Sequence, residues 1–404
     1  MTVSRQRTLP VIVGAGASLA AGAPSTSALL DTVLDSLPTE RVTIVGNQST
    51  TQPLPLAANV RQALATGFGP EVDFELVMAS LEELLSYGLG NGTVIRSFTE
   101  PRATFAPLLD TPMLFSAYSS AVKALIDVFL KKIPISQEQI AAHQALCSLF
   151  GRLTGRSRLV VATLNYDTLL DDASTWFNGF VGPPELYREF DPLAWRARVN
   201  ARDCHLMIHL HGSLRFGLRP TTALSGNAPF NEPVLYPTES LAAQTIGRGV
   251  SNPTVDGHLL PATPIIVGGH KSPKLMHNPR PYAYYNATAL DEIVTSDRLL
   301  IIGYGFRDQH VNAWIDEHLR LHPGGRIGIV TRRTGRDIGE NTAVERFLMK
   351  LGQGDANRDY IYEPVGGAAQ PLAIHGNIGR AYLVATGVPM AQDVETALLA
   401  YLLN

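Results

Sequence analysis

Short apolar runs, each ended abruptly by glycine or polar residues, constrain the fold of this chain more than any other feature of its sequence. The first run, residues 9–13, is rich in β-branched side chains and stops at Gly14. Later runs of the same kind occupy residues 158–163, 206–210, 298–302 and 326–330. Such runs are typical of parallel strands buried on both faces. Because parallel strands need crossover connections, the sequence predicts an α/β domain with helices on both faces of a parallel sheet.

A helical block separates the first predicted strand from the second. From Phe74 the apolar positions follow the i, i+3, i+4, i+7 spacing of one buried helix face. A second helix is predicted over 112–132. Ser136, with a glutamine three residues later, forms a capping-box pattern that begins a third helix ending near Phe150. The chain therefore carries a helical insertion over about 55–150.

Three other segments are assigned from their composition. Residues 46–57 are polar and interrupted by proline, which predicts a loop. Residues 217–262 are rich in Gly, Pro, Ser, Thr and Asn, and predict a long loop or lid. The tail, 331–404, has weak strand signals and ends in a helix from about Gln392 to Leu403. We expect this tail to be a C-terminal α/β extension that offers oligomer or partner contacts.

The balance of charges and the cysteine count exclude several classes of protein. Net charge is -3, from 33 Lys and Arg against 36 Asp and Glu, which leaves no electrostatic footprint for direct nucleic-acid or membrane binding. Only two cysteines occur, Cys147 and Cys204, so neither a disulfide framework nor a four-cysteine zinc site can form. We expect two reduced thiols in a cytoplasmic protein.

The first residues also imitate a secretory signal. Arg5 and Arg7 precede an apolar stretch, and small residues follow at 21–23. However, glycines at 14 and 16 interrupt that stretch, and cleavage would discard the first strand. We therefore interpret the segment as a strand and a loop. No apolar run elsewhere reaches the roughly 20 residues of a membrane span.

The first motif, Gly14-Ala15-Gly16-Ala17-Ser18, follows the first strand directly. Glycines let a backbone approach a pyrophosphate, and a helix beginning near Ala17 would supply free N–H donors. The dehydrogenase fingerprint needs a third glycine where this chain has Leu19, and no acidic residue follows at the required distance. A tight strand–helix turn with no ligand is the alternative.

The second motif, Thr163-Leu164-Asn165-Tyr166-Asp167, closes a buried strand. Ligands of open α/β sheets bind at the carboxyl ends of strands. Asn165 and Asp167 could therefore hold ribose hydroxyls or a water. Alternatively, Asn165 turns the chain and Asp167 caps the next helix.

The third motif, His209-Leu210-His211-Gly212-Ser213, closes another strand. We expect His211 to be the last strand residue, with its ring directed into the crevice, where it could act as a general base. His205, His209 and His211 share strand parity, which leaves a metal site as an alternative, although no carboxylate stands at metal-ligand spacing. A buried structural histidine is the other alternative.

The fourth motif runs from Ile301 through Gly303-Tyr304-Gly305-Phe306 to Asn312. A strand enters glycines and then a helix, with Asp308 as the expected N-cap. Gly303 and Gly305 would let the backbone lie against a nucleotide. His310 is expected to be an ordinary residue of the first helical turn.

In this order, the motifs Gly-Ala-Gly-x-Ser, Thr-x-Asn-x-Asp, His-Gly and Gly-x-Gly-Phe resemble the sirtuin-like superfamily over roughly residues 9–320. The similarity is greatest to a bacterial branch with Asn-Tyr-Asp and Gly-Tyr-x-Phe-x-Asp-x-His-x-Asn stretches. The resemblance implies a Rossmann-like NAD-binding domain over 1–330, in which Asn165, Asp167 and His211 face the nicotinamide ribose as catalytic residues. The cofactor-binding residues predicted on this basis are Gly14, Ala15, Gly16, Ala17, Ser18, Pro24, Thr163, Gly303, Gly305 and Phe306.

Two departures from the sirtuin deacylases affect the expected activity. The chain cannot build their four-cysteine zinc module, so no zinc is expected. It also has Ala-Pro-Ser-Thr-Ser over 23–27 where they have Ile-Pro-Asp-Phe-Arg, and only Pro24 matches. Zinc-free relatives are typically NAD hydrolases of bacterial anti-phage defence. Relatives of this length often assemble with a HerA-type hexameric ATPase.

The resemblance therefore implies an NAD+ glycohydrolase that releases nicotinamide and ADP-ribose, with NAD+ as its substrate. Because unchecked hydrolysis of NAD+ would be toxic, we expect a poorly active free chain that is activated in a homo-oligomer or in a complex with the ATPase. A non-catalytic sensor of NAD or ADP-ribose that regulates a partner is one alternative. An NAD-dependent protein deacylase is the other.

Overall fold

The computed structural model describes residues 7–37, 39–45, 48–53, 58, 62, 73–88, 111–132, 136–171, 176–219, 233–245, 254–255, 258–259, 265–267, 279–331, 375–378, 381–384, 390 and 392–403. Within these residues a seven-stranded sheet has the order β14-β15-β13-β12-β1-β4-β7. Its strands are β1 (Thr8–Val13), β4 (Arg158–Thr163), β7 (Leu206–His209), β12 (Arg298–Ile302), β13 (Arg326–Val330), β14 (His375–Ile378) and β15 (Ala381–Val384).

The order of the strands is that of a doubly wound nucleotide-binding sheet. All neighbours from β15 to β7 pair in parallel, and β14 adds an antiparallel edge. Numbered in chain order, the parallel strands stand 3-2-1-4-5-6, and this order reverses between β1 and β12. The predicted parallel α/β sheet is confirmed. The reversal identifies the place where ligands of such sheets bind.

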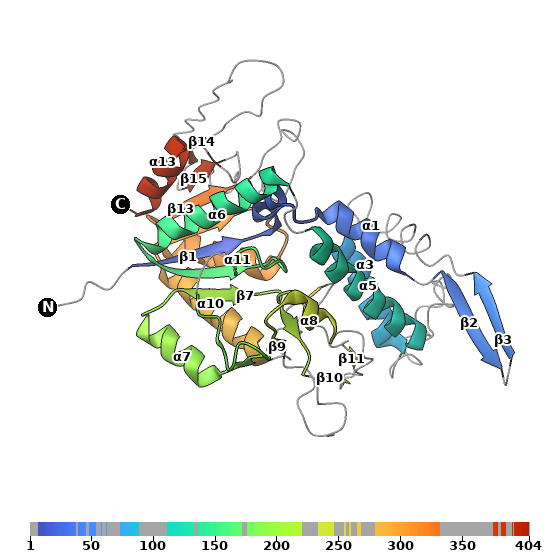
Figure 1. The fold of residues 1–404 in the computed structure, drawn as a ribbon. Coiled ribbons are helices and arrows are strands. Elements are labelled where there is room, and N and C mark those ends of the chain that lie inside the picture. The colour runs from blue at the N-terminus through green and yellow to red at the C-terminus, as the bar shows by residue number, and fades with distance from the viewer. Residues whose placement is uncertain are drawn as a thin grey trace, which may run out of the picture.

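Alternate residues of the central strands enter separate cores on the two faces of the sheet. Val11 and Val13 pack with α6 (Gln137–Thr154) and α13 (Gln392–Leu403). Ile12 enters the opposite core, with α7 (Pro192–Ala201), α10 (Tyr284–Thr295) and α11 (Gln309–Leu321). Figure 1 shows the two helical layers above and below the sheet. Burial on both faces explains why these strands are continuous apolar runs.

Two helices within the predicted insertion of 55–150, together with one helix that precedes it, form a third core beside the carboxyl ends of the strands. It contains α1 (Thr26–Ser36), α3 (Phe74–Gly88) and α5 (Thr111–Lys132), which pack on one another (Figure 1). The same core includes Tyr166 and Leu214, which follow β4 and β7. The insertion therefore supports the loops of the second and third motifs. The capping box that begins α6 at Ser136 is confirmed.

Two segments predicted as loops contain regular structure. Residues 46–57 were expected to be a loop, but β2 (Glu40–Val45) and β3 (Gln48–Pro53) form an antiparallel hairpin, because their β-branched side chains favour strands despite the polar composition. In the segment 217–262, β9 (Val234–Leu235) pairs with β8 (Phe216–Gly217). The same segment forms α8 (Glu239–Ala243), β10 (Thr254–Val255) and β11 (His258–Leu259). Its other residues past 219 lie largely outside the described residues.

The tail contributes to the main sheet. β15 pairs with β13, β14 pairs with β15, and α13 covers one face. The rest of 332–391, apart from these strands and residue 390, lies outside the described residues. The remaining short elements are β5 (Phe180–Val181), which pairs with β6 (Glu189–Phe190), and η4 (Pro279–Ala283), which precedes α10.

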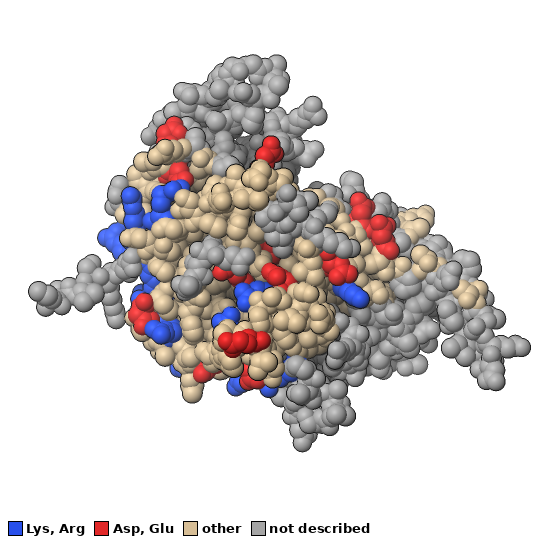
Figure 2. Space-filling view, in the orientation of Figure 1, with Lys and Arg blue, Asp and Glu red and all other residues tan. Residues whose placement is uncertain are grey.

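No helix among the described residues has the length and apolar character needed to cross a membrane. On the face of the molecule seen in Figure 2, basic and acidic side chains of the described residues are interspersed between uncharged ones. This distribution agrees with the near-neutral balance of the sequence.

Candidate active site

Two glycine loops lie backbone against backbone at the point where the strand order reverses. The amide of Gly14 donates to the carbonyl of Ile302 (2.9 Å), and the amide of Gly16 donates to the carbonyl of Gly303 (2.9 Å). Gly303 has a φ of 62°, and a Cβ there would lie 2.0 Å from the amide nitrogen of Ala17. These glycines are thus required for packing between the loops. Beside Gly305, in contrast, the position of a Cβ has no heavy atom within 4 Å.

The predicted helix near Ala17 is wrong. Two 3-10 turns, η1 (Ala15–Ala17) and η2 (Leu19–Ala21), follow the first loop, and the left-handed Gly22 ends them. α1 begins only at Thr26, because proline disfavours helical geometry in the residue before it. Pro24 is buried immediately before Ser25, which caps α1. The first loop therefore offers amides from short turns and lacks a full helix N-terminus.

The side-chain amide of Asn165 is held in one orientation. Its Nδ2 donates to the carbonyl of Gly14 (3.1 Å) and to Oγ of Ser18 (2.9 Å). Its backbone amide donates to Oγ1 of Thr163 (3.1 Å). With both protons of Nδ2 used, Oδ1 is left as a buried acceptor that has no hydrogen-bond partner among the described residues. An unmade buried hydrogen bond costs roughly 1–3 kcal/mol, so this oxygen is suited to a hydroxyl or a water.

Asp167 is a buried carboxyl group whose ionisation is disfavoured. Burial raises its pKa from 3.8 to about 6, against the lowering effect of the Ser18 hydroxyl and the Leu169 amide. Oδ1 accepts from that amide (3.3 Å). Residues 168–171, which follow Asp167, form a turn closed by the hydrogen bond from the Asp171 amide to the Thr168 carbonyl (2.9 Å). Ser18 interacts with both Asn165 and Asp167, so the first and second motifs form one network.

His211 lies in a turn, and the expectation that it ends the strand is wrong. β7 ends at His209, and the amide of Ile266 donates to the carbonyl of His211 (2.7 Å), which draws the chain away from the sheet. The His211 ring is buried, 6.5 Å from the ring of Tyr166 and 6.0 Å from that of His310. Its Nε2 lies 3.6 Å from Oδ1 of Asp308.

Asp308 is the functional candidate that the sequence analysis missed. It stands at the N-cap position of α11, as predicted, but its side chain makes no capping hydrogen bond. The Tyr304 hydroxyl accepts from the Asp308 amide (3.2 Å) and lies 2.9 Å from Oδ1 of Asn312. Asn312 in turn donates to the carbonyl of Phe306 (2.9 Å), which has a left-handed φ of 54°. Most of the fourth motif therefore shapes the turn that presents Asp308 to His211.

The histidines of β7 do not converge on a metal. His205 accepts from the amide of Leu159 (3.0 Å) through Nδ1, and Nε2 of His209 lies 3.0 Å from Oδ1 of Asp171. Within the part of the chain that the structure describes, no group of three or more potential ligand side chains is placed to hold a metal ion. His310 lies in the first turn of α11, as expected.

The predicted residues thus fall into two groups. The loop 14–18, Thr163, Asn165 and Asp167 are joined with Gly303 by hydrogen bonds and close packing. His211 faces the turn that contains Gly305 and Phe306. Pro24 follows the two 3-10 turns in the sequence.

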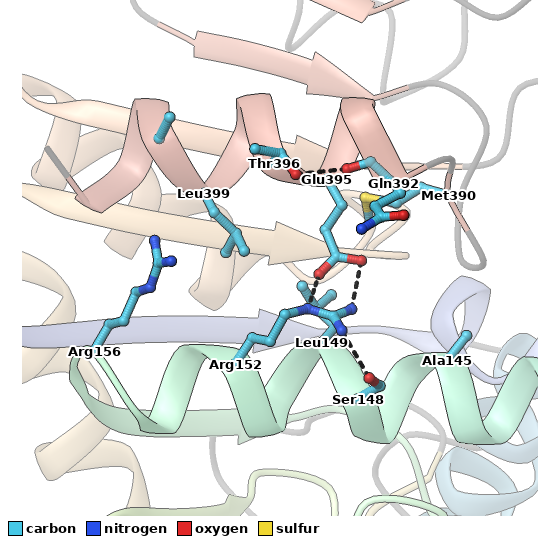
Figure 3. A pocket seen from close by; sticks show the side chains of 11 residues that line it. Ala145, Ser148, Leu149, Arg152, Arg156, Met390, Gln392, Glu395, Thr396 and Leu399 are labelled. Carbon is cyan, nitrogen blue, oxygen red and sulfur yellow. Dashed lines mark hydrogen bonds and ion pairs between the residues drawn. The ribbon is translucent and has the colours of Figure 1, made fainter.

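A separate cavity of about 460 Å³ lies between α6 and α13 (Figure 3). Its walls carry the ion pair of Arg152 and Glu395 together with Arg156, and Leu149 and Leu399 supply apolar surface. None of the predicted site residues lines it. The cavity lies over one face of the sheet, so we do not place the chemistry there.

The topology and the site define a doubly wound α/β protein with polar groups gathered at its switch point. No family model and no curated protein matches the chain. Among solved structures it is similar to Sir2Tm bound to a propionylated peptide, with 13% identity over 86% of this chain and 94% of that chain and a TM-score of 0.35. It is also similar to a mutant Sir2 homologue in complex with ADP-ribose, with 15% identity, 88% and 97% coverage and a TM-score of 0.35. A Sir2 homologue–NAD complex is similar with 15% identity over 82% of this chain and 81% of that chain, and a TM-score of 0.32. Because these values are low, the chemistry of the site has to be derived from this chain's own residues.

Proposed function

We propose that this protein is an NAD+ glycohydrolase that breaks the bond between nicotinamide and ribose. The observation that carries the proposal is the fixed amide of Asn165, whose Oδ1 is buried and has no partner among the described residues. Such an acceptor suits a ribose hydroxyl or the attacking water. The reversal of strand order between β1 and β12 supports a dinucleotide at this place.

In the proposed reaction, the C1′–N bond breaks and nicotinamide leaves with the bonding electron pair. The ribose develops positive charge as a water attacks C1′. Asn165 orients that water or a neighbouring hydroxyl, and His211 accepts the proton that the water loses. Asp308, 3.6 Å from His211, would stabilise the imidazolium that results. Asp167 holds Ser18, which in turn holds Asn165.

Nicotinamide release from NAD+, measured by mass-resolved chromatography of the products formed by the purified chain alone and in its assembled forms, tests this function. Release that yields ADP-ribose and is lost in Asn165→Ala is the expected result. If every assembled form bound NAD+ and none released nicotinamide, the sensor would be favoured instead. Release that depends on an added acyl-lysine peptide would favour the deacylase, and either result would contradict the proposal.

We further propose that the chain works in an assembly and depletes NAD+ during anti-phage defence. The support is the resemblance of the four motifs to the zinc-free bacterial branch, together with the need to restrain such an activity. The expected assemblies are a homo-oligomer and a complex with a HerA-type ATPase. Size-exclusion chromatography with light scattering on the chain, alone and with the ATPase, tests this. A monomer in both samples would contradict it.

A further inference from the structure

A buried histidine–aspartate pair lies directly behind the candidate site. His209, the last residue of β7, is 1% exposed, and its Nε2 lies 3.0 Å from Oδ1 of Asp171. Asp171 ends the turn 168–171, which follows Asn165 and Asp167 in the segment after β4. The pair therefore connects that turn to the strand end that leads into His211.

Stability alone does not account for this pair. Two ionisable groups removed from water stabilise a fold poorly compared with well-packed apolar residues. Within the described residues neither Nδ1 nor Nε2 of His209 makes a hydrogen bond, so the approach of Nε2 to Asp171 is a close charge contact, and the ring packs on Phe216 with the two ring centres 5.6 Å apart. The location between two functional loops indicates that the pair contributes to the site.

The pair also acts on Asp167 through its charge. Burial is the largest cause of the raised pKa of Asp167; beyond burial, Asp171 raises this pKa and His209 lowers it. Ser18, from the first loop, lowers the same pKa by hydrogen bonding. The two members of the pair thus have opposite effects on one carboxyl group.

Asp171 also interacts through its charge with Arg188 and with Tyr285 of α10. Two more titratable side chains contact the turn from neighbouring helices. His143 of α6 lies 2.8 Å from the carbonyl of Leu169, and Glu239 of α8 accepts from the hydroxyl of Thr168 (2.5 Å). Both contacts are with residues beside Asp167, and neither involves a side chain of the pair. They therefore serve as a constant background in tests of the pair.

We propose that His209 and Asp171 are positioning residues that keep the loop of Asn165 in register with His211. The inference deepens the proposed function and rests on it only for the catalytic measurement. His209→Gln and Asp171→Asn keep the size and polarity of each side chain, so they remove charge with little loss of packing.

The first test does not depend on activity. The free energy of unfolding is measured against pH with and without Asp167→Asn, in the unchanged chain and in each pair variant. The difference between the two curves reports the pH at which Asp167 ionises. Asp171→Asn should move this pH down, because it removes a repelling charge. His209→Gln should move it up, because it removes an attracting one.

The second test is catalytic. Each pair variant should lower kcat on the order of 10²-fold with little change in KM, because a shift of about 1 Å in a reacting group costs that much. The acid limb of the profile of kcat against pH should move down in Asp171→Asn and up in His209→Gln. Matched controls are His318→Gln, whose buried ring contacts the carbonyl of Ile293 (2.8 Å), and Asp203→Asn, which removes an exposed partner of Arg198.

The controls should leave both the ionisation of Asp167 and kcat as they are. If the two pair variants moved the pH at which Asp167 ionises in the same direction, or did not move it, the inference would be overturned and the pair would be a purely structural feature. Opposite shifts in a chain that never releases nicotinamide would uphold the charge balance beside Asp167 while refuting the proposed function.

Discussion

Replacing Asp167 with asparagine should stabilise the protein at neutral pH and much less under acid conditions. Burial raises the pKa of this carboxyl from 3.8 to about 6. Between these values the folded protein holds a proton that the unfolded chain has lost, so its stability falls as the pH rises through this window. A rise of about two pKa units lowers the free energy of unfolding by about 3 kcal/mol at pH 7.5. At pH 4.5 it lowers it by only about 1 kcal/mol.

Urea denaturation of the unchanged chain and of Asp167→Asn at both pH values measures this cost. The amide can still accept from Ser18 and Leu169, so pH-independent changes cancel when the two pH values are compared. We expect the gain in unfolding free energy to be about 2 kcal/mol larger at pH 7.5 than at pH 4.5. Asp203→Asn, an exposed control, should show little such difference. Equal gains at the two pH values would refute the raised pKa and the charge network built on it.

Two other predictions concern the loops of the site. Gly303→Ala should destabilise the fold by about 2 kcal/mol or more, because its Cβ would meet the Ala17 amide and its φ is left-handed. Gly305→Ala should leave the midpoint of unfolding unchanged. Equal midpoints for the two variants would contradict the close packing of the loops. Asp308→Asn should lower the rate of nicotinamide release by about 10²-fold, since it weakens stabilisation of protonated His211. Its stability should change by less than about 1 kcal/mol, because asparagine keeps the size of the side chain and no capping hydrogen bond is lost. An unchanged rate would remove Asp308 from the mechanism.

The sheet could be predicted from the sequence because its signal is local. Strands such as β4 and β12 are buried on both faces, so each is an unbroken apolar run ended by glycine or a polar residue. The helix that begins after Ser136 was equally clear, because its capping box is encoded within four residues. Sequence also indicated that the second and third motifs lie at one edge, since the carboxyl ends of parallel strands meet there.

The contacts within the site depend on residues far apart in the chain, and these could not be predicted. Gly14 and Gly16 read as a ligand loop, yet their tightest contact is with Gly303, which lies almost three hundred residues later. Asp308 has the sequence context of a helix cap, and only the approach of His211 shows another role. The β2–β3 hairpin was missed because its polar composition hides its β-branched pattern.

The rate of nicotinamide release by Asn165→Ala tests the central claim most directly. Asn286→Ala is the matched control, since Asn286 of α10 also donates from Nδ2 to a backbone carbonyl, that of Tyr282 in η4 (2.9 Å). The account predicts that Asn165→Ala loses at least about 10²-fold in rate, as much as His211→Ala or more, while the control releases nicotinamide at the full rate. Undiminished release by both Asn165→Ala and His211→Ala, from folded proteins, would contradict the assignment of the site.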